Sequence, residues 1–156
     1  MASQSPERFE LIKLAEKLNK DYYPLTELLC KNAKVQAEWL KENNAGTVPF
    51  LQFCNDLSEK IAHHVSMSRS VIEVCREQQR DGVFFSSNAF MQSRESIARV
   101  FADIRREGKE KTPVEWEEMH DNLEMKLNVL NNLLVELFRI EDKDLIPLLE
   151  KNLSLN

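Results

Sequence analysis

FLQFCNDLSEKIAHHVSMSRSVIEVC, residues 50–75, is the only long segment that combines apolar residues, helical periodicity and possible site residues. Its apolar side chains recur at steps of three and four, which places them on one side of an α-helix. We therefore predict a long helix whose buried face consists of Phe50, Cys54, Leu57, Ile61, His64 or Val65, Ser68, Val71 or Ile72 and Cys75.

The composition is that of one folded helical domain. The chain has 156 residues, of which 42% are hydrophobic and 30% charged, and this supports a single domain over residues 1–156. Only 3 Gly and 5 Pro are available for turns, too few for an all-β fold. We expect few connections and long helices.

The net charge indicates the class of partner, and the N-terminus and the cysteines indicate the cellular compartment. A net charge of -5 disfavours direct nucleic-acid binding and favours a basic protein partner. The N-terminus MASQSPERFE resembles no signal peptide and no apolar run could span a membrane, so we predict a cytoplasmic protein without membrane contact. Cys30, Cys54 and Cys75 have no metal-site spacing and are expected to be reduced and buried.

The first helix is expected to begin at Pro6 and to kink near Lys20, because Pro24 lacks an N–H and crowds the carbonyl four residues earlier. We predict that its apolar stripe stays in phase through the kink and consists of Leu11, Leu14, Leu18, Tyr22, Leu25 and Leu29. Val35, Trp39 and Leu40 would add further turns, before a C-cap at residues 43–46 and a possible N-cap at Thr47.

Two more helices complete the predicted fold. One is expected from about Asn88 to residues 105–108, with Phe90, Ile97, Phe101 and Ile104 buried. The last begins with a capping box at residues 112–115, is bent or ended by Pro147, and buries Trp116, Met119, Leu123, Leu127, Leu130, Leu134, Leu137 and Leu145. The predicted fold is all-α, an antiparallel four-helix bundle with a kinked first helix.

Residues that could carry chemistry are few. A carboxylate-bridged metal pair needs several inward Glu and His side chains, and the chain has one Glu-x-x-His spacing, Glu117 to His120. No set of residues combines a base, a nucleophile and an oxyanion donor, so we expect no enzyme and no cofactor.

Phe84 and Phe85 form either a hydrophobic staple or an exposed anchor for a partner. Residues 141–144 form either a solvated acidic face or a contact for a basic helix.

Two stretches resemble one family. Phe53-Cys54-x-x-Leu57, followed by Glu59 and His64, is similar to the second-helix pattern of the Rsd/AlgQ proteins, bacterial regulators of sigma factor. Residues 138–146, with Phe138, Glu141-Asp142 and then aliphatic residues, are similar to the C-terminal pattern of that family. A one-residue gap is needed before the His, and Ala62-His63 replace small residues of the family.

The resemblance implies an anti-sigma factor: an antiparallel helical bundle, without an active site, that binds the DNA-recognising C-terminal region of the primary sigma factor. Glu59 stands where the family has an acid on the binding helix, and our candidate partner-binding residues are Glu59, His63, His64, Glu141 and Asp142. The partner is expected to be a sigma factor or another basic transcription protein, and the chain to be a monomer or weak dimer.

Two alternatives stay open. One is a hemerythrin-like metal-binding helical bundle that uses His64 and His120 with Glu117 and Glu141. The other is a helical scaffold that associates with itself.

Overall fold

The computed structural model describes residues 6–42, 49–77, 87–107 and 117–154. These residues are helical throughout and contain no strand. The elements, among them two π-helical segments labelled η, are α1 (Pro6–Lys17), η1 (Leu18–Tyr22), α2 (Tyr23–Glu42), α3 (Pro49–Glu77), α4 (Ser87–Glu107), α5 (Glu117–Ile140), η4 (Glu141–Leu145) and α6 (Ile146–Ser154).

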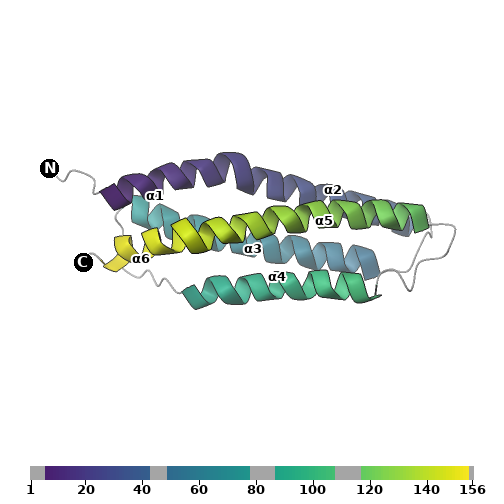
Figure 1. Ribbon diagram of the computed structural model, residues 1–156. Coiled ribbons are helices and arrows are strands. Elements are labelled where there is room, and N and C mark those ends of the chain that lie inside the picture. The colour runs from purple at the N-terminus through teal and green to yellow at the C-terminus, as the bar shows by residue number, and fades with distance from the viewer. Residues whose placement is uncertain (1–5, 43–48, 78–86, 108–116, 155–156) are drawn as a thin grey trace.

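The helices run alternately up and down a single bundle (Figure 1). The helix from α1 to α2 runs in one direction, α3 returns, α4 runs parallel to α2, and α5 returns again. α3 packs against α2 and α4, α2 also packs against α5, and α1 packs against α6. The predicted all-α, four-helix bundle is confirmed.

The core contains the predicted face of the central helix. Cys54, Leu57, Ile61, His64, Val65, Ser68, Val71, Ile72 and Cys75 are all buried. The predicted stripes of α4 and of α5 from Leu123 onwards are buried as well. The side chains of Phe50, Trp116 and Met119 lie outside the described part of the chain.

Each π-helical segment stands at the same distance before a proline. η1 covers the positions from six to two residues before Pro24, and η4 covers the same positions before Pro147. Proline cannot donate the hydrogen bond to the carbonyl four residues earlier. In both segments the residue before the proline donates its N–H five residues back instead, from Tyr23 to Leu18 and from Ile146 to Glu141.

The π-helical segment η1 changes the buried face of the first helix. We predicted that the apolar phase continues through Pro24 with Tyr22, Leu25 and Leu29 inside. This is wrong for Leu25, which is exposed, while Tyr22 and Leu29 are partly buried against the core. The fully buried side chains are instead Tyr23, Thr26, Cys30, Ala33 and Ala37, and the first three each come one residue after a predicted position. A widened turn takes up one extra residue, and one residue rotates the following face by about 100°.

Three other predicted features lie outside the described residues. These are the cap signals at 43–47, the aromatic pair Phe84–Phe85 and the capping box at 112–115.

We expect Leu130→Ala to lower the free energy of unfolding by about 2–5 kcal/mol, because it removes a large buried side chain and leaves a cavity. Leu130 is fully buried on α5, whereas its neighbour Val129 is exposed. Val129→Ala is therefore the matched control and should change stability by less than about 0.5 kcal/mol. Urea unfolding followed by circular dichroism measures both, and equal effects would contradict the packing described here.

Candidate functional site

A buried polar cluster lies between α3, α4 and η4. It consists of His64, Ser93, Arg94, Glu141 and Asp142, and we call it the His64–Glu141 cluster. The exposed fraction is 1% for His64 and 0% for Glu141. Burying an ionisable group without partners is costly, so these two side chains need hydrogen-bond partners inside the bundle.

His64 is held through both ring nitrogens. Nε2 lies 2.7 Å from Oε2 and 3.0 Å from Oε1 of Glu141, and Nδ1 lies 2.9 Å from Oγ of Ser93. A carboxylate only accepts hydrogen bonds, so Nε2 carries the proton. In the neutral ring Nδ1 then accepts from the Ser93 hydroxyl, and in the imidazolium it donates to the same oxygen.

Arg94 supplies the charge that Glu141 needs. Its Nη2 and Nε donate to Oε1 of Glu141 at 2.8 and 3.2 Å, and its Nη1 donates to Oδ1 of Asp142 at 2.6 Å. The carboxylate of Glu141 therefore accepts from Arg94 and from His64 together. Asp142 stands at the outer end of the cluster, where its side chain is 60% exposed.

Two phenylalanines close the apolar sides of the cluster. The rings of Phe90 and Phe138 meet the His64 ring edge-on, with centroids 5.6 and 5.2 Å away. The guanidinium of Arg94 lies 5.1 Å from the centroid of Phe138. Since Phe138 and Glu141 are three residues apart, the helix brings both side chains to the same histidine.

Glu141 lies inside the bundle because it continues the buried stripe of α5, four residues after Leu137. Ile140 and Glu141 are adjacent in the chain and both are buried, while Asp142, Lys143 and Asp144 are exposed. We expected residues 141–144 to form one charged surface, and for Glu141 that is wrong. Only the three residues after it are on the outside.

The other two candidate residues line a hollow between α3 and α4. Its volume is about 430 Å³, and its lining residues are Glu59, Lys60, His63, Met67, Ala89, Gln92, Ser93 and Ser96. Glu59 and His63 are exposed. Ser93 both lines this hollow and bonds His64, so the hollow adjoins the buried cluster.

The five candidate residues lie on α3 and η4 in two groups, which Ser93 of α4 connects. Glu59, His63 and Asp142 are accessible, whereas His64 and Glu141 lie behind the surface. Sequence reasoning did not single out Ser93 or Arg94. Ser93 falls between Phe90 and Ile97 on the buried stripe of α4, which was a usable signal, but the spacing of Arg94 gave none.

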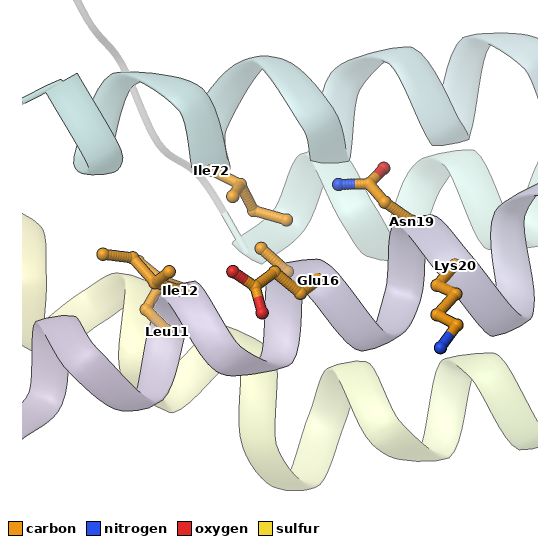
Figure 2. Close-up of a pocket in the computed structure, with 7 residues that line it drawn as sticks. Leu11, Ile12, Glu16, Asn19, Lys20 and Ile72 are labelled. Carbon is orange, nitrogen blue, oxygen red and sulfur yellow. The ribbon is translucent and has the colours of Figure 1, made fainter.

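A second hollow, of about 310 Å³, lies between the first helix and α3 (Figure 2). Ile72 enters it from α3, and the remaining lining residues come from α1 and η1: Leu11, Ile12, Ala15, Glu16, Asn19 and Lys20. Part of this lining continues into a larger groove that contains Arg69. None of the five candidate residues lines this hollow.

The order Ser93, His64, Glu141 resembles a nucleophile, a base and an orienting carboxylate. Acyl transfer also requires donors aimed at the developing oxyanion. Ser93 lies inside α4, where backbone N–H groups are used by the helix, and 8% of the residue is exposed. The three residues alone therefore satisfy buried polar groups without forming a complete acyl-transfer site.

The metal alternative fails on geometry for the residues we considered. Glu117 is the first residue of α5 and Glu141 directly follows the last, Ile140, so His120 is about 30 Å along the helix from Glu141. These residues cannot bind the same ion. Within the four described ranges, no group of three or more His, Cys, Asp and Glu side chains is placed to hold a metal.

The cysteines are buried thiols, as predicted. Burial raises the pKa of the Cys54 thiol to about 12, and the neighbouring Cys30 adds to this shift. Burial also raises the pKa of Cys30, although a hydrogen bond with Ser58 opposes the change. The thiolate is the nucleophilic form, so neither side chain is activated.

Comparisons with protein-family models, with curated proteins and with solved structures found no match. None of the helices in the described ranges has the length and apolar character needed to cross a membrane.

We expect Glu141→Ala to lower the free energy of unfolding by about 3–5 kcal/mol, because it leaves Arg94 and His64 without their acceptor inside the bundle. Asp142→Ala also removes a carboxylate bonded to Arg94, but at an exposed position, and should cost less than about 1 kcal/mol. Urea unfolding of both variants at neutral pH measures the difference. A Glu141 variant as stable as the Asp142 variant would contradict the cluster.

The raised pKa of Cys54 predicts a loss of stability at alkaline pH. Its ordinary value is 9.0 and its folded value about 12, so the unfolded chain loses this proton first as the pH rises. The stabilisation is complete below about pH 9 and is lost as the pH rises toward 12. Urea unfolding across this range should show stability falling less steeply in Cys54→Ala than in the native chain. Equal slopes would contradict the shift.

Proposed function

We propose that this chain is a non-enzymatic binding protein that captures a basic transcription protein, with the C-terminal DNA-binding region of a sigma factor as the first candidate. The observation that carries the proposal is the contact between His64 and Glu141, 77 residues apart in the chain. His64 belongs to one stretch that resembles the Rsd/AlgQ proteins, and Glu141 belongs to the other.

The contact joins the two stretches at one place in the fold. Phe138 and Glu141, from the second stretch, both touch His64, from the first. Two stretches that resemble one family and lie far apart in the sequence thus meet in the bundle, which supports the resemblance. The anti-sigma role follows from the resemblance.

The accessible surface around the cluster suits a basic partner. Glu59 lies on α3 at the hollow beside α4, and Asp142 lies where η4 meets Arg94 of α4. A DNA-recognising helix-turn-helix region is basic because it faces phosphates, so it complements these carboxylates and the net charge of -5. Binding there would cover the partner's DNA-recognising side, and no chemical step is needed for inhibition.

Binding to a purified sigma-factor C-terminal region, measured by pull-down and by titration calorimetry, tests the proposal. We expect Glu59→Lys and Asp142→Lys each to weaken binding by about tenfold at about 50 mM salt, and by less at about 300 mM, because salt screens charge attraction. Both carboxylates are exposed, so neither variant should unfold the protein.

Glu10→Lys is the matched control. It makes the same charge change at an exposed position of α1, away from α4. Equal weakening by all three variants would indicate only long-range attraction. Failure of the native protein to bind at about 50 mM salt would remove the sigma-factor proposal.

A further inference from the structure

The outer face of α2 carries a row of exposed apolar side chains. Leu25, Leu28, Val35 and Trp39 have exposed fractions of 42, 52, 55 and 40%, all on one helix of 20 residues. An exposed apolar patch of a few hundred Å² on a protein surface is often functional. These side chains face outward because η1 rotates α2 relative to the phase of α1.

The spacing along this row is that of a two-stranded helical interface. With Asn32 included, the positions 25, 28, 32, 35 and 39 alternate steps of three and four, which is the a and d pattern of a heptad. Asn32 is the one polar residue among these five positions, and it lowers the stability of such a pair. α2 therefore has a seam directed away from its own bundle.

We propose that the outer face of α2 binds α2 of a second copy of this chain, in an antiparallel pair related by a two-fold axis near residues 33 and 34. Leu28 then lies opposite Trp39 of the second copy, and Asn32 lies opposite Val35 of the second copy. This interface is independent of the proposed sigma-factor surface, which lies along α3, α4 and η4.

Charge complementarity favours a second copy of this chain as the partner and an antiparallel direction for the pair. Lys31 and Glu38 are seven residues apart and border the row on the same side. In the antiparallel pair Lys31 lies beside Glu38 of the second copy, with an axial offset of about 3 Å, and the symmetry makes this ion pair twice. In a parallel pair Lys31 would instead face the neutral Gln36.

The area indicates a weak dimer. Four half-exposed side chains contribute about 350 Å² per copy, or about 700 Å² in total, below the 1,200 Å² or more of stable interfaces. Polar residues at the edges add to this area, and Asn32 reduces its apolar character. We expect a dissociation constant on the order of 100 μM.

Sedimentation equilibrium of the full chain, from about 10 μM to 1 mM, tests the proposal against that expected constant. Val35→Lys should weaken dimerisation at least tenfold, because two ammonium groups would enter the seam. Val135→Lys is the matched control, since Val135 is equally exposed but lies on α5, and it should leave the constant unchanged. Circular dichroism verifies that both variants stay folded.

A charge exchange tests the direction of the pair. Lys31→Glu places two carboxylates together on each flank and should weaken the dimer several-fold, and adding Glu38→Lys should restore it. A parallel pair would respond little to either change. The proposal would be overturned if the chain stays monomeric at about 1 mM. It would also be overturned if Val35→Lys and Val135→Lys weaken the dimer equally.

Discussion

A buried carboxylate constrains the arrangement of this bundle. Glu141 has no exposed surface, and its two oxygens accept from His64 of α3 and Arg94 of α4. A buried charge is tolerated only with such partners at close range, so α3, α4 and the end of α5 must keep their relative positions. Ser93 extends the same constraint to the hollow beside α4. The cluster thus fixes the helices that display Glu59, His63 and Asp142.

One widened turn sets the outer apolar face of α2, and a second begins at the buried carboxylate. Pro24 and Pro147 each follow a π-helical segment at the same spacing. Before Pro147, the widened turn begins at Glu141, which already lies on the buried stripe of α5, four residues after Leu137. Before Pro24, the widened turn directs Tyr23 inward and leaves Leu25 outside. The same local response of a helix to a missing N–H therefore shapes the exposed face of α2 and follows the buried carboxylate of η4.

A binding role is compatible with this construction. Recognition by charged and apolar side chains requires that they be held in fixed relative positions, which a packed bundle with a satisfied polar cluster provides. The proposed partner surface and the proposed dimer surface lie on different helices. One copy could therefore use both at once, and the two proposals can fail independently.

The amino-acid pattern was enough to predict the class of fold and most of the core. Periodic apolar residues predicted α3, α4 and α5 because burial of a stripe dominates helix packing, and that signal is local. The two stretches around His64 and Glu141 were also singled out from their residues. The contact between the two stretches could not be predicted from the sequence. It joins positions 77 residues apart and depends on how three helices meet.

Tertiary structure alone decided which charged residues are inside. From its charged neighbours, Glu141 was expected on a solvated face with Asp142 and Asp144, and from its spacing Leu25 was expected in the core. Leu25 is outside because the extra residue in the π-helical turn η1 rotates the face that follows it. Glu141 stands four residues after Leu137 on the buried stripe of α5, but a carboxylate is tolerated there only because Arg94 and His64 reach it from other helices.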